Sequence, residues 1–181
     1  MFTGLDWLND IIQAALSFVP RPVVVRNTHA MLKWKWGKVV VKQPGWRWYW
    51  PLTTDYEEIV TAVQPLDLAA QTLMTKDSVE VTCGGVIVFQ ITDPIKACGE
   101  KNYDVNGMVD VIAQAAIVEV ITQWPFDMLL PDMAGIEKDL TKACKARLRR
   151  YGVNVHRAAL NSFSTAATYN IMGVSLNTPP E

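Results

Sequence analysis

The chain has 181 residues, of which 50% are hydrophobic and 19% charged, so it can bury a sizeable core and is not intrinsically disordered. Its net charge of −1 hides an asymmetry: residues 1–50 hold seven Lys/Arg against two Asp, a balance of +5, and the rest of the chain carries −6. The three cysteines are widely spaced and odd in number, which indicates neither a disulfide framework nor a metal knuckle and favours a reducing compartment.

An amphipathic helix is predicted over residues 5–19, where polar side chains recur every three or four positions. Its apolar side holds Trp7, Leu8, Ile11, Ile12, Ala15, Leu16 and Phe18. At roughly 1.5 Å per residue the helix reaches only about 22 Å, less than the ~30 Å hydrocarbon core of a bilayer, so no conventional spanning helix is expected. It either lies in a membrane interface or packs on its own domain, and Pro20-Arg21-Pro22 ends it as a hinge.

Short β-rich runs follow at 23–25, 31–36, 38–42 and 46–50. Period-2 alternation places Trp34 and Trp36 on one face of a strand, and it places Trp46, Trp48 and Trp50 on one face of another. The opposite faces hold Lys33, Lys35, Arg47 and Tyr49. Two interpretations remain open: the tryptophans form one core layer of a sheet, or they lie at the headgroup level of a membrane.

The remaining elements predict an α+β fold, with strands first, then a helical pair, then a returning strand. The strands are expected at 56–64, 66–75, 79–92 and 153–160, with a turn at 76–78. Helices are expected at 105–124, capped by Asp104 and stopped by Pro125, and from Pro131-Asp132 to Tyr151-Gly152. Residues 165–181 form a short tail with a weak β run at 171–176.

Recognisable catalytic chemistry is absent from the sequence. His29 and His156 are the only histidines, and neither has metal-ligand spacing to a pair of Cys, Asp or Glu. No GxSxG, Walker or GxGxxG motif occurs, and Gly84-Gly85 lies inside a strand pattern with no helix after it to cradle a phosphate. We therefore expect no enzyme activity, no metal and no cofactor.

Several short motifs occur in an order that resembles the band 7 family, also called the SPFH domain, whose members include stomatins, prohibitins and flotillins. Residues 36–51 look like the family opening, with WGKVV followed by QPGWRW and WP. Residues 63–81 are similar to the central signature, with VQPLDL, QTLMTKD and VEV. Residues 86–97 contain VIVF, ITDP and Ala97, and YGVNV at 151–155 matches the entry to the last strand.

The resemblance implies two small α/β subdomains and a non-catalytic, oligomeric membrane scaffold of the stomatin or prohibitin type, which organises lipids or partner proteins such as a membrane protease. It divides the chain into a membrane-interface helix with a Pro-rich hinge (1–22), a band 7 domain (23–163) and a C-terminal tail (164–181). We expect a monotopic or peripheral membrane protein on the cytoplasmic face, with no nucleic-acid partner. The alternative is a structural subunit of a larger assembly, such as a virus particle.

Two contact surfaces are predicted. The membrane or partner contact residues are Trp7, Leu8, Ile11, Ile12, Leu16, Phe18, Trp34, Trp36, Trp46, Trp48 and Trp50. The second surface is a basic ridge on the second helix, formed by Lys138, Lys142, Lys145 and Arg149. Because residues 51–130 are rich in Asp and Glu, this ridge is expected to dock on the acidic face of the next copy, giving a homo-oligomer that closes into a ring if the rotation permits.

Overall fold

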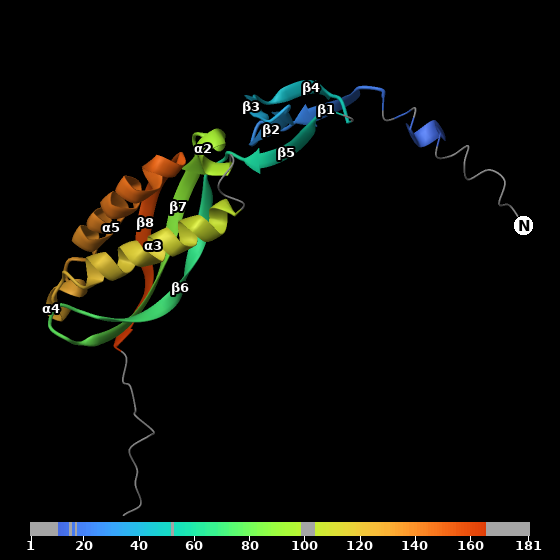
Figure 1. Ribbon diagram of the computed structural model, residues 1–181. Helices are drawn as coiled ribbons and strands as arrows, with labels where there is room; N and C mark the ends of the chain where they lie inside the picture. The colour runs from blue at the N-terminus through green and yellow to red at the C-terminus, as the bar shows by residue number, and fades with distance from the viewer. Residues whose placement is uncertain (1–10, 15, 17, 52, 99–103, 166–181) are drawn as a thin grey trace, which may run out of the picture.

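The computed structural model describes residues 11–14, 16, 18–51, 53–98 and 104–165, and it confirms the α+β class. The chain forms a small part built from strands, followed by a larger part in which helices cover a sheet (Figure 1).

The first part consists of a two-stranded ribbon and a three-stranded sheet. In the ribbon, β1 (Arg21–Val25) pairs antiparallel with β4 (Gly45–Tyr49). In the sheet, β2 (His29–Lys35) lies between β3 (Lys38–Lys42) and β5 (Asp55–Val60), and both pairings are antiparallel. The predicted β-rich runs are therefore confirmed, except that β2 ends one residue before Trp36 and β4 ends one residue before Trp50.

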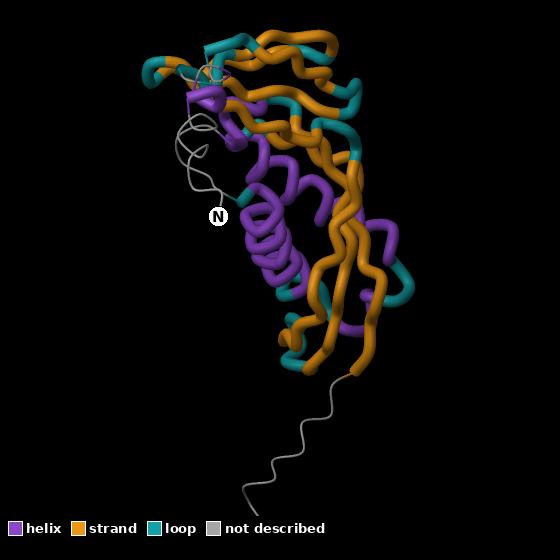
Figure 2. Tube along the Cα trace, turned by 90° about the vertical axis from the view of Figure 1, so that its right-hand side faces the viewer, coloured by secondary structure: helices purple, strands orange, loops and turns teal. Residues whose placement is uncertain are grey.

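The second part is built on a three-stranded antiparallel sheet of order β6-β7-β8. Its strands are β6 (Gln64–Met74), the central β7 (Glu80–Ile91) and β8 (Val153–Thr165). Two long helices, α3 (Val105–Ile121) and α5 (Met133–Leu148), cover one face of this sheet (Figure 2). The chain also forms α2 (Pro94–Cys98), α4 (Phe126–Leu129) and the 3₁₀ turn η1 (Arg149–Tyr151).

The core lies between β7 and the two long helices. Alternate residues of β7 are buried, as the period-2 pattern predicts: Val81, Cys83, Gly85, Ile87, Phe89 and Ile91. Helix α5 buries the stripe Ile136, Leu140, Cys144 and Leu148 against them. Both helices begin where a carboxylate caps them, since Asp104 accepts from Gly107 N at 3.0 Å and Asp132 accepts from Gly135 N at 3.1 Å.

Several predicted boundaries are wrong. Strand β5 ends at Val60, because the amides of Thr61 and Ala62 both donate to Thr28 O and turn the chain away from the sheet. Strand β8 continues to Thr165, since its pairing with β7 extends along the whole strand.

Helix α3 ends at Ile121, three residues before the predicted end, and the hydroxyl of Thr122 donates to Val118 O at this end of the helix. The four-residue helix α4 is not predicted, because it is too short to show periodicity.

Of the predicted N-terminal helix, residues 11–14 and 16 are helical, while 5–10 lie outside the described residues. Trp7 and Leu8 also lie outside them, as does the predicted β run at 171–176. Within the part of the chain that the structure describes, no helix combines the length and the apolar character needed to cross a bilayer.

Gly152 lies between η1 and β8, and its backbone contacts the residues that directly follow β7. It has φ of 72°, and its carbonyl accepts hydrogen bonds from Thr92 N at 2.9 Å and Asp93 N at 3.0 Å. A Cβ at this position would lie 2.5 Å from Asp93 O. Gly37 has the same φ of 72° but nothing within 4 Å of its Cβ position, so it offers a matched control.

Gly152→Ala is expected to lower the free energy of unfolding by about 3 kcal/mol, because it combines left-handed strain with a backbone clash. Gly37→Ala is expected to cost about 1 kcal/mol, because only the strain applies. Urea unfolding followed by circular dichroism measures both. Equal losses in the two variants would contradict the importance of the close approach to Asp93.

Candidate functional site

One face of the β1–β4 ribbon exposes apolar side chains. The register pairs Pro22 with Trp48 and Val24 with Trp46, so these four residues share a face. All four are exposed, with 69% of Trp46 and 62% of Trp48 accessible to solvent. The strand-pattern prediction placed Trp46 and Trp48 together, and the structure confirms this, but it missed Pro22 and Val24, whose membership depends on a pairing that the sequence does not reveal.

Trp36 is the most exposed of these tryptophans, at 82%. It does not lie in a strand, as the alternation suggested, but at the apex of the β2–β3 hairpin with φ of 51°. Gly37 follows with φ of 72°, so the two form the positive-φ pair of a type I′ turn. Trp50, directly after β4, is 50% exposed.

Trp36 and Trp50 lie at the end of the first part that is away from the helices, and the exposed face of Trp48 and Trp46 runs back from this end along β4. The rings of Tyr49 and Tyr56 lie 4.6 Å apart between their centroids, which places the end of β4 beside the start of β5. Lys33 Nζ donates to Trp48 O at 3.4 Å, which brings the end of β2 to the same place. Because β5 runs from here toward β6, the β2–β3 apex lies at the far end (Figure 1). We call Trp36, Trp46, Trp48 and Trp50 the aromatic end.

Trp34 does not belong to this surface. It is half-buried and packs against the core that includes Leu32 and Ile59. Of the five tryptophans in the strand region, Trp34 therefore packs on the core, as the first interpretation predicted, and the other four are exposed.

The segment before β1 continues the exposed apolar surface. In the described part of the predicted helix, Ile11, Ile12, Leu16 and Phe18 are all exposed. They lead into β1 from the side away from α3 and α5 (Figure 1). The structure thus does not pack these side chains into the core of the domain.

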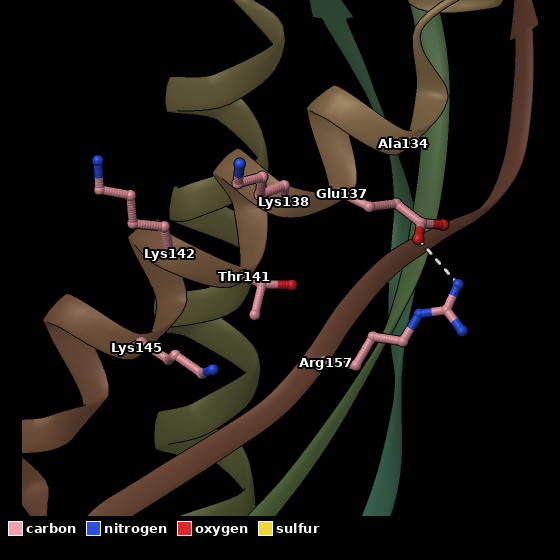
Figure 3. A pocket seen from close by; sticks show the side chains of 7 residues that line it. All are labelled: Ala134, Glu137, Lys138, Thr141, Lys142, Lys145 and Arg157. Atoms are coloured by element: carbon pink, nitrogen blue, oxygen red, sulfur yellow. Dashed lines mark hydrogen bonds and ion pairs between the residues drawn. The ribbon is translucent and has the colours of Figure 1, made fainter.

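The predicted basic ridge lies along the exposed side of α5. Lys138, Lys142 and Lys145 border a groove of about 550 Å³ between α5 and β8. Figure 3 shows Lys145 extending toward β8 and Lys142 extending away from it. Arg149 borders a neighbouring groove with Lys145, so all four predicted side chains form one continuous exposed surface.

Two other basic residues near α5 are already paired within the chain. Arg157 Nη2 lies 2.8 Å from a carboxylate oxygen of Glu137 across the groove (Figure 3). Arg147 forms an ion pair with Glu119. Among the described residues, the four ridge cations form no such pair.

Cys83 and Cys144 are buried and Cys98 is half-buried. Burial raises the pKa of Cys83 and Cys144 to about 11, and burial together with the nearby charge of Glu57 raises the pKa of Cys98 to about 11. His29 contacts Thr28, and His156 contacts Gln90. No group of three potential metal ligands is found in the described ranges.

Gly84-Gly85 lies where the β7–β8 register shifts, and a Cβ on Gly85 would be 2.8 Å from Ala159 O, so close strand packing explains the pair.

Comparisons with known proteins agree with the resemblance inferred from the motifs. A family model described as SPFH domain / Band 7 family matches residues 23–171. Stomatin homologs of Pyrococcus horikoshii and Pyrococcus abyssi are each 27% identical over 134 residues, 73% of this chain. An uncharacterized protein of Archaeoglobus fulgidus is 21% identical over 150 residues, covering 82% of this chain and 60% of the relative. The chain spans about half the length of the stomatin homologs, 50% and 49%.

Native thiols are expected to react with iodoacetamide about a hundredfold more slowly than the same thiols in the unfolded chain at about pH 8, because only the thiolate reacts. The raised pKa values of Cys83, Cys98 and Cys144 reduce the thiolate fraction. Mass spectrometry of native and urea-unfolded samples gives both rates. Fast labelling of one cysteine in the native protein would reveal an activated thiol and contradict the packing role.

Proposed function

We propose that this chain, which belongs to the SPFH domain / Band 7 family, attaches peripherally to a membrane surface and acts there as a non-catalytic, oligomeric scaffold. The observation that carries the proposal is the aromatic end, in which four tryptophans between 50% and 82% exposed lie on the small strand-built part, at the β2–β3 apex and along β4. Folded proteins rarely leave large apolar side chains clustered in water without a partner.

A membrane interface suits this surface better than a dry protein pocket. Tryptophan is enriched at the headgroup level, where its ring is apolar and its N–H stays hydrated. The exposed segment around Ile11, Ile12, Leu16 and Phe18 precedes the ribbon and adds apolar area on the same side of the molecule. Both surfaces can therefore meet one bilayer.

The cysteines and the family support the compartment that we propose. Cys83, Cys98 and Cys144 are all unpaired, which suits a reducing environment. We place the protein at the cytoplasmic face of a membrane, where a scaffold of the stomatin type organises lipids or partner proteins. The names of the two Pyrococcus relatives, stomatin homologs, support this type.

Oligomerisation is the second component of the proposal. The ridge of Lys138, Lys142, Lys145 and Arg149 is exposed and pairs with no described carboxylate, whereas Arg147 and Arg157 nearby are neutralised within the chain. Exposed carboxylates on β5, at Asp55, Glu57 and Glu58, offer a complementary surface on a second copy. A head-to-tail contact of this kind closes into a ring when the rotation between copies permits.

The variant Trp46→Ala/Trp48→Ala is expected to bind vesicles at least about tenfold more weakly, because burying one large apolar side chain contributes about 1.5 to 3 kcal/mol. Vesicle flotation of the full chain measures the partition. The control is Val111→Ala/Leu130→Ala, which removes side chains that are 66% and 63% exposed on the helical part.

Two outcomes would contradict the membrane proposal. Equal losses in the tryptophan variant and the control would mean that the aromatic end has no special role. Absence of flotation for the unmodified chain, together with a stable oligomer, would instead support a structural subunit of a protein assembly. A variant lacking residues 1–19 separates the contribution of the N-terminal segment from that of the tryptophans.

Lys142→Glu is expected to weaken self-association about tenfold at low salt, because it places like charges at the contact. Lys76→Glu, at the exposed β6–β7 turn, makes the same charge change away from the ridge and should leave association unchanged. Analytical ultracentrifugation in detergent measures both. A monomer at every concentration rejects oligomerisation, while a normal oligomer formed by Lys142→Glu rejects the ridge as its interface.

A further inference from the structure

The apex of the β2–β3 hairpin has an unfavourable backbone conformation, and the contacts of its side chain do not compensate for it. Trp36 occupies the left-handed region with φ of 51°, where a bulky side chain is disfavoured by about 1 to 2 kcal/mol. The usual residues at this position of a type I′ turn are Asn, Asp and Gly. The side chain gains no packing in return, because it is 82% exposed.

The two residues that flank the turn are also unfavourable together. Lys35 and Lys38 lie directly opposite each other in the β2–β3 ladder, and like charges in such a pair destabilise a sheet. Both are exposed, and neither forms an ion pair or a side-chain hydrogen bond with a described residue. The apex therefore presents two unneutralised ammonium groups, and the exposed Trp36 lies between Lys35 and Lys38 in the sequence.

Opposed residues in an antiparallel pair have Cβ atoms about 4.5 to 5.5 Å apart. Two lysine side chains that start this close can converge on a single phosphate, since each ammonium carries three donors on a flexible stem. The indole at the turn would then enter the interface beside the headgroup. The exposed indole and the opposed lysine pair, both unfavourable in water, become favourable against an anionic, phosphate-bearing surface.

The charge of the surrounding sheet is divided between its two edges. Lys38 and Lys42 are exposed on β3, which forms one edge, whereas Glu57 and Glu58 are exposed on β5 at the other. On the acidic edge, the residue nearest the apex is Asp55 of β5, which lies opposite Trp34 of β2. The positive charge of this sheet thus lies at the apex and along the β3 edge.

We propose that Lys35, Trp36 and Lys38 form a headgroup-binding finger that selects anionic phospholipids. This inference rests on the proposed membrane attachment and adds the lipid class. The apolar surface of Trp46 and Trp48 supplies affinity for any bilayer, and the finger supplies the preference for a negatively charged one. Each lysine near an anionic surface contributes about fivefold in affinity, so the pair gives about twenty- to thirtyfold.

The test uses the full chain with phosphatidylcholine vesicles, with and without added phosphatidylglycerol, at about 0.1 M salt. Unmodified protein should bind the anionic vesicles more tightly. Lys35→Gln/Lys38→Gln should lose about twenty- to thirtyfold on these vesicles and little on neutral ones. The control Lys76→Gln/Lys96→Gln removes the same charge from exposed positions outside the finger and the ridge, and should keep the preference.

A second measurement guards against misfolding. Removing the opposed charges should leave the melting temperature of Lys35→Gln/Lys38→Gln equal to or above that of the unmodified chain, because the like-charge pair is unfavourable in water. A lower melting temperature would show that the opposed lysines do not destabilise the hairpin, and it would contradict the proposal.

The outcomes separate the two proposals. Binding to both vesicle types with no preference, or a preference that survives Lys35→Gln/Lys38→Gln, overturns the finger and leaves membrane attachment intact. No binding to either vesicle overturns membrane attachment itself. Tighter binding to a single-stranded oligonucleotide than to anionic vesicles, lost in the same variant, would overturn the finger in favour of a nucleic-acid contact.

Discussion

Burial of alternate β7 side chains beneath α3 and α5 is the interaction on which the rest of the structure depends. Cys83 and Ile87 are fully buried, and the central strand pairs on both sides, with β6 and with β8. The helices therefore pack on a face of β7 that is held in place by its hydrogen-bonded pairing with β6 and with β8. The same core cluster extends through Ala97 of α2 to Leu32 of β2, so the strand-built part is joined to the helical part by packing as well as by the chain.

In the central signature that resembles the band 7 family, the hydrogen bonds of Thr75 and Asp77 stabilise the fold. In the central signature, the hydroxyl of Thr75 accepts from Val79 N and donates to Val79 O, which closes the β6–β7 hairpin. The carboxylate of Asp77 accepts from Phe126 N at 3.1 Å, where α4 begins. The signature thus ties the sheet to the helix pair, and it indicates the fold without indicating any chemistry.

The sequence predicts those features that depend on local periodicity. The alternation of β7 and the apolar stripe of α5 both identify the core correctly, because each strand or helix shows one face to it. The capping residues Asp104 and Asp132 are predictable for the same local reason.

Features that depend on strand pairing cannot be predicted in this way. Trp34 and Trp36 are two residues apart in an alternating run, yet the first packs on the core and the second sits at a hairpin apex, because β2 ends between them. Pro22 and Val24 join the exposed face only through their register with β4. The opposed pair Lys35 and Lys38 appears only once the two-residue turn is known.

The two proposed contact surfaces lie on different parts of the molecule, and this separation has a functional consequence. The aromatic end belongs to the strand-built first part, whereas the ridge on α5 lies on the second part (Figure 1). A copy attached to a bilayer through its tryptophans therefore leaves the α5 ridge free for a neighbour. Attachment also holds every copy in the same orientation on one plane. Orientation in a plane lowers the entropy that association must overcome, so weak exposed charge pairs, which contribute little in solution, gain effect when many copies share a surface. A membrane-bound scaffold can thus assemble through contacts too weak to hold the same oligomer in water.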